Sequence, residues 1–189
     1  MEIQWSLVLF TALTGMGGCM FACVAADEFL GRAKAAAFPA AVAALVGIDQ
    51  AIKLWAVNAL QPVGAMPFIP HVVELRFVLN QGMAFSLLSG KQLFLIIATS
   101  AALLAVAYVL FFRSRGKYLQ QAAMILVLGG GIGNLIDRVL NGEVVDYINL
   151  LFMRFAVFNF ADICVCVGVG LWVLVIFLEE LHGENAKEQ

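Results

Sequence analysis

Long runs of apolar residues, separated by short polar segments, account for most of the sequence. A helix that crosses a lipid bilayer needs about 20 consecutive and mostly apolar residues. The pattern therefore predicts five membrane-spanning helices, with expected bounds Ile3–Ala26, Phe38–Leu60, Gln92–Phe112, Tyr118–Val139 and Val157–Leu181.

Two segments between these runs have a different pattern. Apolar and polar residues alternate from Val73 to Asn80, which is typical of a strand with one buried face. The Asn80-Gln81-Gly82 turn that follows predicts a returning strand at Met83–Leu88, and so a small β-structure. After a turn signal at Asn141-Gly142, apolar residues at helical spacing up to Phe155 predict a short interfacial helix.

Positive charge sets the expected orientation, because Lys and Arg are enriched in cytoplasmic loops. The loops after the first and third runs hold Arg32, Lys34, Arg113, Arg115 and Lys117. With both loops in the cytoplasm, the N-terminus and the β-structure lie outside and the C-terminus lies inside. A cleaved signal peptide is the alternative for the first run, but Glu2 stands where such a peptide has basic residues, which favours a retained helix.

Composition excludes several classes of protein. Hydrophobic residues make up 63% of the chain and charged residues 13%, and the mean hydropathy is +0.96. A soluble domain is about half apolar and about a quarter charged, so lipid must solvate much of this chain. The formal net charge of −2 argues against a nucleic-acid surface. The two His and four Cys fit no zinc motif, and we expect neither a metal centre nor a disulfide.

Ionisable residues gather toward the expected outer ends of the spans, and Asp162 lies one to two turns into the fifth. Charge at membrane depth is costly and usually marks a functional site. Two carboxylates brought close together share a proton, and one can then act as base on a water while the other acts as acid. The polar positions at helical spacing are Asp49 with Lys53, Asn134 with Asp137 and Arg138, and Asn159 with Asp162, while Asp146 lies in a loop.

A structural explanation exists for most of these residues. Asp49 and Lys53 are more typical of a structural ion pair than of a catalytic pair. The asparagines could form interhelical hydrogen bonds, and the glycine run at 129–133 is typical of close helix packing. Asp162 is the hardest to explain structurally, because it lies in an apolar helix with no basic neighbour in sequence. The residues alone thus indicate a polytopic membrane protein with a buried acidic site.

At these positions the sequence resembles the lipoprotein signal peptidase (signal peptidase II) family, over about Phe38 to Leu181. Any one of the matching blocks is weak evidence, whereas five blocks in the family's order are specific. The blocks are Asp49-Gln50-Ala51-Ile52-Lys53, Asn80-Gln81-Gly82-Met83-Ala84-Phe85, Gly133-Asn134-Leu135-Ile136-Asp137-Arg138, Val144-Val145-Asp146-Tyr147 and Phe158-Asn159-Phe160-Ala161-Asp162.

The resemblance implies an aspartyl endopeptidase that needs no metal or cofactor and cuts prolipoproteins before a diacylglyceryl-modified Cys. It implies a bacterial cytoplasmic (inner) membrane protein with its active site near the periplasmic face. Its partners would be prolipoproteins and membrane lipids, and we expect a monomer. The resemblance places Asp146 and Asp162 at the catalytic positions. It implies substrate-binding or supporting roles for Asn80, Gly82, Asn134, Asp137, Arg138, Asn159, Asp49 and Lys53.

One departure from the family defines the expected domains. The family typically has four spans and begins close to the Asp-Gln block, whereas here an extra segment precedes it. The expected division is an extra transmembrane segment at 1–35, a peptidase core at 36–182 and a cytoplasmic tail at 183–189. The expected fold is an all-α membrane helix bundle of four core spans and one extra span, with a small extracytoplasmic β-cradle. The loop between Asp146 and Asp162 is slightly shorter than in the family.

Two functions from other classes remain open. A proton-coupled transporter would use buried Asp residues as a relay, but it predicts charges through the full membrane depth. A non-catalytic membrane anchor for a partner enzyme would have no need of Asp162. The extra N-terminal segment is the only feature that supports the anchor.

Overall fold

The computed structural model describes residues 37–82, 90–113 and 118–185. Within these residues, four helices are long and apolar enough to cross a membrane, which confirms four of the expected spans. The fifth expected span, Ile3–Ala26, lies outside the described residues. The four helices are Ala37–Leu60, α3 (Gln92–Phe112), α4 (Tyr118–Asn141) and α5 (Phe160–Asn185), of which Phe160–Leu181 is the apolar part.

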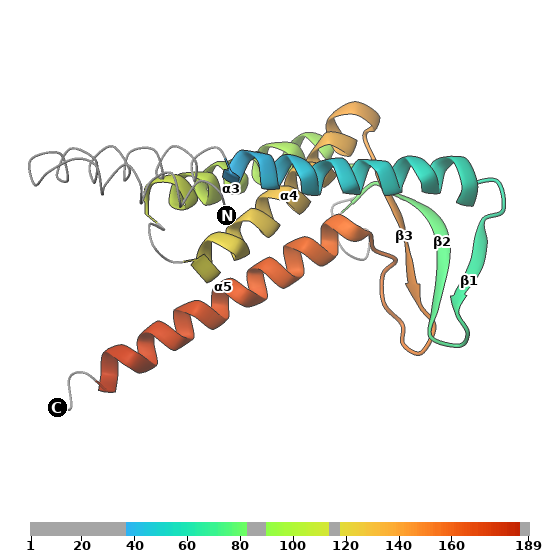
Figure 1. Cartoon of the computed structure of the whole chain (residues 1–189). Coiled ribbons are helices and arrows are strands. Elements are labelled where there is room, and N and C mark those ends of the chain that lie inside the picture. Colours follow the sequence, from blue (N-terminus) through green and yellow to red (C-terminus); the bar gives the residue numbers. More distant parts are fainter. Residues whose placement is uncertain (1–36, 83–89, 114–117, 186–189) are drawn as a thin grey trace, which may run out of the picture. The chain divides into compact units, whose positions relative to one another are not determined.

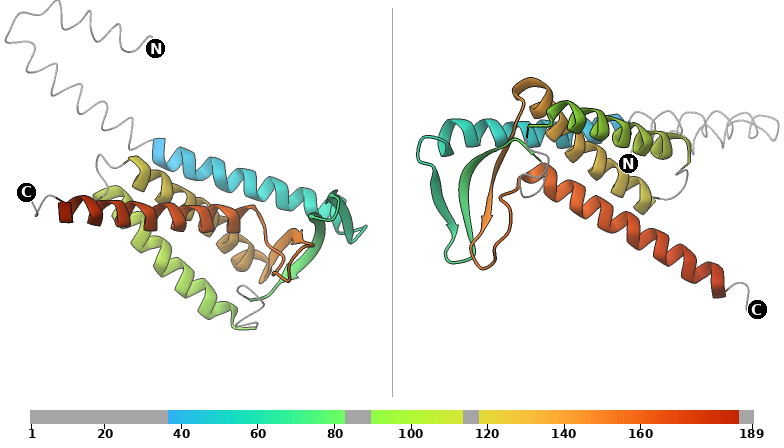
Figure 2. Two further views of the ribbon diagram at one scale, coloured as in Figure 1. Left: turned by 90° about the horizontal axis from the view of Figure 1, so that it is seen from below. Right: turned by 180° about the vertical axis from the view of Figure 1, so that it is seen from behind.

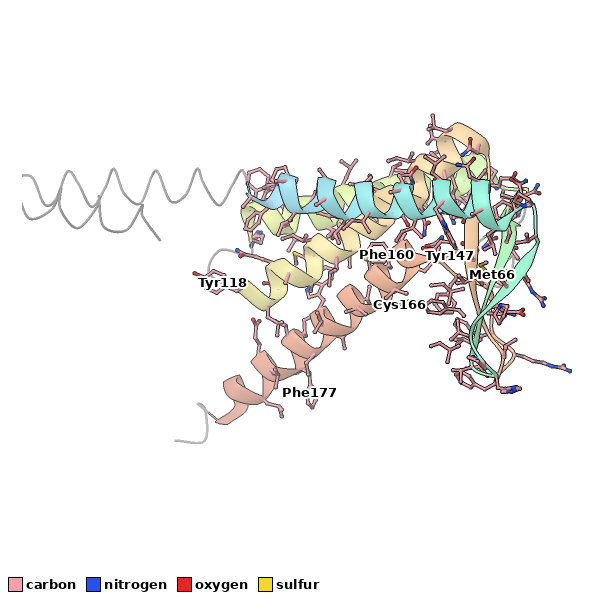
Figure 3. All side chains as sticks on the ribbon, turned by 45° about the vertical axis from the view of Figure 1, so that its right-hand side comes forward. Met66, Tyr118, Tyr147, Phe160, Cys166 and Phe177 are labelled. Carbon is pink, nitrogen blue, oxygen red and sulfur yellow. The ribbon has the colours of Figure 1, made fainter. Side chains whose placement is uncertain are left out.

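Large apolar side chains cover the lipid-facing sides of these helices. Leu93 and Leu104 on α3 are 71% and 72% exposed. Phe177 on α5, labelled in Figure 3, is 57% exposed. Apolar patches of this extent are unfavourable in water and are satisfied by lipid. The exposure therefore agrees with the composition in indicating a membrane-embedded protein.

The first helix ends in a wide turn that leads directly into the sheet. Its last five residues form the π-helix η1 (Ala56–Leu60). Gln61 keeps helical dihedral angles, and Pro62 after it has no N–H to continue the helical hydrogen bonds. The N–H of Gly64 donates to the Leu60 carbonyl at 2.9 Å, and Gly64 has a φ of 75°, which suits glycine. The chain thus leaves the helix and turns back as a strand.

Glycines let α4 pack closely against three neighbouring helices. A Cβ atom at Gly129 would meet Leu45 of the first helix, and one at Gly131 would meet Leu103 of α3. At Gly130 it would meet the backbone carbonyl of α5. The glycine run is therefore a packing device, as its position within an apolar span indicates. Figures 1 and 2 show α4 among these helices, in the compact unit of the chain that begins at Ala41.

Three antiparallel strands form a sheet in the order β1 (Ala65–Ile69), β2 (Val73–Asn80) and β3 (Val144–Leu150). The sheet lies beyond the Leu60 end of the first helix and beside the start of α5 (Figures 1 and 2). Its inner side packs on the end of that helix through Leu75, Phe77, Val145 and Tyr147, against Ala56 and Leu60. β2 confirms the strand predicted from the alternating pattern.

The interfacial helix expected between Asn141 and Phe155 is wrong, because Val144–Leu150 forms the strand β3 and residues 151–155 are irregular. Helical spacing of a few apolar residues is weak evidence when β-branched residues such as Val144, Val145 and Ile148 are present. The second edge of β2 makes this segment a strand, because it offers unpaired backbone groups. Pairing Val78 with Asp146 and Asn80 with Val144 satisfies the backbone groups of both strands.

The other neighbour of β2 also differs from the expectation. The returning strand expected at Met83–Leu88 lies outside the described residues. Instead, β1, which precedes β2 in the chain, pairs with it antiparallel, with Ala65 opposite Arg76. β1 contains Pro67, which lacks an N–H and is tolerated on an edge strand. Proline weakens the sequence signal for a strand, and the pattern therefore did not predict β1.

Candidate active site

Two residues at the start of α5 cap each other's backbone. The N–H of Asp162 donates to Asn159 Oδ1 at 2.9 Å, and the N–H of Asn159 donates to Asp162 Oδ2 at 3.1 Å. This is the reciprocal arrangement of a capping box, with Asn and Asp in its two positions. It fixes the Asp162 carboxylate in the first turn of α5, slightly earlier than the one to two turns expected from the sequence.

The next two free amides of α5 are bound by side chains from distant elements. The first N–H groups of a helix have no partner within the helix. The Phe160 N–H donates to the Tyr147 hydroxyl oxygen at 3.1 Å, and the Ala161 N–H donates to Asp49 Oδ1 at 3.2 Å. Figure 3 shows Tyr147 and Phe160 close together. The start of α5 is thereby attached to both β3 and the first helix.

Asp146 lies on β3 and is only 2% exposed. Asn80 Nδ2 donates to its Oδ2 at 2.9 Å, and Asn159 Nδ2 donates to its Oδ1 at 2.7 Å. Burial raises the pKa of Asp146 from 3.8 to about 7, and the nearby charge of Asp162 adds to this rise, while the two asparagine hydrogen bonds oppose it. At neutral pH Asp146 therefore holds a proton for a substantial fraction of the time.

Asn159 joins the two aspartates. Its side chain is fully buried, accepts from the Asp162 backbone through Oδ1 and donates to Asp146 through Nδ2. Because a backbone N–H can only donate, it determines which end of the Asn159 amide faces Asp146. Asn80 is oriented in the same way, since the Gly82 N–H donates to its Oδ1 at 2.9 Å. Both amides consequently present NH₂ groups to Asp146.

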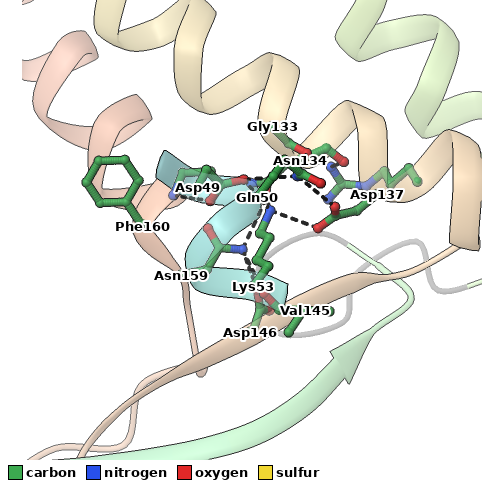
Figure 4. Close-up of polar contacts among 12 residues, drawn as sticks. Asp49, Gln50, Lys53, Gly133, Asn134, Asp137, Val145, Asp146, Asn159 and Phe160 are labelled. Atoms are coloured by element: carbon green, nitrogen blue, oxygen red, sulfur yellow. Dashed lines mark hydrogen bonds and ion pairs between the residues drawn. The ribbon is translucent and has the colours of Figure 1, made fainter. Parts of the chain in front are cut away.

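Lys53 is the centre of a buried polar cluster that is connected to Asp162 through Asn134 (Figure 4). It is 3% exposed, and its Nζ lies 2.8 Å from both Asp49 Oδ2 and Asp137 Oδ2. Its Nζ also donates to Asn134 Oδ1 at 2.8 Å, and Asn134 Nδ2 donates to Asp162 Oδ1 at 2.8 Å. The cluster thus provides the acceptors that a buried ammonium needs, and it extends to Asp162.

Arg138, on α4, contacts the backbone next to this polar cluster. Its Nη2 donates to the Gly82 carbonyl at 3.2 Å and its Nη1 to the Asn134 carbonyl at 3.4 Å. Within the described parts of the chain, its buried Nε has no hydrogen-bond acceptor. A donor of this kind is available to a bound carbonyl or anion.

A cavity of about 870 Å³ opens between α3, α4 and α5 beside this network. Its walls are mainly apolar, with Leu95 and Leu103 from α3 and Ile163 from α5. The polar residues that line it include Asn80, Asn134, Arg138, Asp146 and Asp162. An apolar cavity with a few convergent polar groups is typical of a ligand-binding site.

The structure brings the site residues predicted from the sequence into one connected network. The predicted Asp49–Lys53 ion pair is present. No group of three or more His, Cys, Asp or Glu side chains placed to hold a metal occurs among the described residues. The network contains Asp49, Lys53, Asn80, Gly82, Asn134, Asp137, Arg138, Asp146, Asn159 and Asp162.

Sequence reasoning missed two members of this network. Gln50 Nε2 donates to Asp137 Oδ1 at 3.0 Å and to the Gly133 carbonyl at 3.2 Å, which ties the first helix to α4. Tyr147 caps α5 as described above. Each lies next to a predicted site residue in a matching block, but its partner is far away in sequence. The sequence therefore contains no local signal for either contact.

Comparison with known proteins agrees with this geometry. Residues 41–178 match the family model described as signal peptidase (SPase) II. A lipoprotein signal peptidase of Streptococcus pyogenes serotype M2 (strain MGAS10270) is 39% identical over 142 residues, which cover 74% of this chain and 91% of the relative. The corresponding protein of serotype M3 (strain ATCC BAA-595 / MGAS315) is 38% identical over the same length.

Solved structures give the same result. A bacterial membrane enzyme determined by the in meso method at 2.3 Å resolution is similar with a TM-score of 0.71 and 32% identity, covering 77% of this chain and 90% of that one. A second such structure, at 1.9 Å resolution, has a TM-score of 0.68 and 32% identity, covering 75% and 92%. The resemblance seen in the sequence is confirmed: this chain belongs to the signal peptidase II family of lipoprotein signal peptidases and is a multi-pass membrane protease.

Proposed function

We propose that the protein is an aspartyl endopeptidase that removes signal peptides from diacylglyceryl-modified prolipoproteins by cutting before the lipidated Cys. The observation that carries this proposal is the bridge formed by Asn159 between Asp146 and Asp162 at the wall of an apolar cavity. Two carboxylates in one protected site can divide the roles of acid and base between them.

The surroundings of the two aspartates favour one division of these roles. The raised pKa of Asp146 favours a protonated acid there at neutral pH. Asp162 lies at the N-terminus of α5, where the helix dipole favours a negative charge. Asp162 takes a proton from a water, and the resulting hydroxide attacks the scissile carbonyl carbon. Asp146 gives its proton to the carbonyl oxygen. Collapse of the tetrahedral intermediate breaks the C–N bond: Asp162 passes the proton it took from water to the leaving amine, and Asp146 regains a proton from the hydroxyl that becomes the new carbonyl oxygen.

The cavity fits a substrate that is part lipid and part peptide. Its apolar walls between α3 and α5 suit acyl chains, which would enter by diffusion within the membrane. The Nε of Arg138, which has no acceptor among the described residues, suits the peptide before the modified Cys. We place the enzyme in the bacterial cytoplasmic (inner) membrane as a monomer, with the sheet and the dyad near the periplasmic face and the Arg113 loop in the cytoplasm.

A gel-shift cleavage assay tests the proposal. The purified protein in detergent is mixed with a diacylglyceryl-modified prolipoprotein, alongside Asp146→Asn and Asp162→Asn. Wild type should convert the precursor to the shorter lipoprotein, and each variant should lose at least about 10³-fold of this activity. Mass spectrometry of the product should show the modified Cys as its new first residue.

Glu180→Gln is a matched control on the same helix as Asp162. Glu180 is exposed and lies 18 residues further along α5, about 27 Å away. This variant should cleave like wild type. Turnover by folded Asp146→Asn or Asp162→Asn at the wild-type rate would disprove the assigned dyad. Failure of folded wild type to cut a substrate that another family member cuts would favour the anchor function.

A further inference from the structure

We infer that Lys53 is a positioning residue for the proposed peptidase reaction and acts on Asp162 through Asn134, by fixing the orientation of the Asn134 amide. This inference rests on the proposed aspartyl mechanism and adds a role for a residue that does not line the cavity. The contacts form a chain of three residues from the first helix through α4 to α5, with both hydrogen bonds 2.8 Å long.

The chemistry of the donors determines the direction of this chain. An ammonium group has three donors and no acceptor, so the group that faces Lys53 must be the carbonyl end of the Asn134 amide. The NH₂ end then faces Asp162 and donates to its Oδ1. The two ends of an amide have nearly the same shape, and in this site the partner decides between them. Without Lys53, the carbonyl end could turn toward Asp162 and repel its carboxylate.

A second donor also reaches Asn134, but it is weaker. Asn159 Nδ2 lies 3.1 Å from Asn134 Oδ1, and the same NH₂ group also donates to Asp146 and to the Val145 carbonyl. The bond from Lys53 is shorter and charge-assisted, and such bonds are roughly twice as strong as neutral ones. Lys53 therefore dominates the orientation of the Asn134 amide.

Two ion pairs hold Lys53 in place for this role. Asp49 and Asp137 bind its Nζ from two helices, and Gln50 donates to both carboxylates. A purely structural cluster would need only these ion pairs. The third donor of Lys53 is directed instead at a neutral amide that contacts a proposed catalytic carboxylate. The cluster is thus a rigid support for one hydrogen bond to Asp162.

The experiment needs a variant that keeps the cluster's charge. Lys53 carries +1 and its two aspartate partners carry −2, which gives −1 for the cluster. Lys53→Met alone would leave two buried carboxylates without a counter-charge and could unfold the protein. Lys53→Met combined with Asp137→Asn leaves Asp49 alone, again at −1. Wild type, Asn134→Ala, this double variant and the double variant with Asn134→Ala added therefore all keep −1, and Asp137→Asn alone controls for the loss of Asp137; in these comparisons Lys53→Met always includes Asp137→Asn.

A double-mutant cycle among these four proteins tests the inference. Full-length variants in detergent are assayed on a diacylglyceryl-modified prolipoprotein, and kcat is measured per folded protein. Lys53→Met should lower kcat on the order of 10²-fold and change KM less than about twofold, since Lys53 does not line the cavity. Asn134→Ala should lower kcat by a similar factor. The two together should be no worse than Asn134→Ala alone, because residues that act as a unit are not additive.

Two further variants separate positioning from folding. Gln50→Leu disturbs the same cluster without touching Asn134, so it should lower thermal stability but lose at least about tenfold less kcat than Lys53→Met. Asn134→Asp keeps all three partners of Lys53 but turns an oxygen toward Asp162. It should fold and lose about as much kcat as Asn134→Ala. Wild-type kcat in Asn134→Asp would overturn the inference even if no Lys53 variant folded.

The outcomes distinguish this inference from the proposed function. Asp162→Asn is measured in the same assay. An active Asp162→Asn variant would refute the aspartyl mechanism itself. An inactive Asp162→Asn variant, together with losses for Lys53→Met and Asn134→Ala that multiply to about 10⁴-fold, would refute only the positioning role of Lys53.

Discussion

Asn159 Nδ2 lies 2.7 Å from Asp146 Oδ1, while the same side chain caps the helix that carries Asp162. Two variants separate these roles. Serine is also a good N-cap residue but cannot reach Asp146 with an NH₂ group. Asn159→Ser should keep the cap but lose the hydrogen bond to Asp146, and its cleavage rate should fall on the order of 10²-fold.

Asn159→Ala should lose the cap as well, at about 1–2 kcal/mol of unfolding free energy. Thermal melts and cleavage rates of both variants in the same detergent provide the comparison. Equal melting temperatures for the two variants would show that the cap contributes little to stability.

The pH dependence of cleavage should reveal the protonated state of Asp146. Its pKa is raised to about 7, chiefly by burial, so the proposed acid loses its proton as the pH rises past 7. We expect kcat/KM to fall about tenfold per pH unit above that value. Initial rates between pH 5 and pH 9, with the fold verified at each pH, provide the measurement. A rate that stays constant to pH 9 would argue against Asp146 as the acid.

The same pKa has a consequence for stability. Between the ordinary value of 3.8 and the native value of about 7, native Asp146 holds a proton that the unfolded chain does not. The native state binds more protons, so the free energy of unfolding falls as pH rises through this window. Asp146→Asn lacks this effect. It should match wild type near pH 4 and be more stable by on the order of 1–3 kcal/mol near pH 8. Thermal melts of both proteins at pH 4 and pH 8 test whether the stability difference has this sign.

Close packing of α4 on α5 should make Gly130 intolerant of any side chain. A Cβ atom at Gly130 would overlap the backbone carbonyl of Ala161, which cannot move without displacing the start of α5. Gly130→Ala should cost at least about 2 kcal/mol of stability and also reduce cleavage, since Asp162 moves with that carbonyl.

Gly170→Ala is the matched control on α5, because nothing lies within 4 Å of a Cβ there. It should be neutral or stabilising. A Gly130→Ala variant as stable as wild type would contradict this packing.

The Tyr147 hydroxyl should contribute to stability in addition to the packing of the ring. Tyr147→Phe keeps the ring in the core but leaves the Phe160 N–H without its acceptor. A buried unpaired N–H costs about 1–3 kcal/mol. Tyr108→Phe on α3 is the control, because Tyr108 is 54% exposed and should tolerate the change. Thermal melts of both variants measure the difference in stability. Equal stability of Tyr147→Phe and wild type would mean that another group replaces the missing acceptor.

The sequence by itself determined the membrane class, four of the spans in the described residues and the strand at β2, and it singled out the polar residues that the structure joins into one network. These features depend on local properties: the length of an apolar run, a period of two, and charges that are too costly in lipid unless they have a function. The matching blocks added the family, which the comparisons confirm.

Only the tertiary structure decided how these residues act together. β3 is a strand because β2 offers it an edge, and no local pattern contains that information. The amides of Asn80, Asn134 and Asn159 are oriented by donors that lie far away in sequence or in the backbone. Folding raises the pKa of Asp146 to about 7, because it buries the carboxyl group and places Asp162 nearby. Hydrogen-bond direction and desolvation are properties of the assembled site, and both arise only when the helices and the sheet pack together.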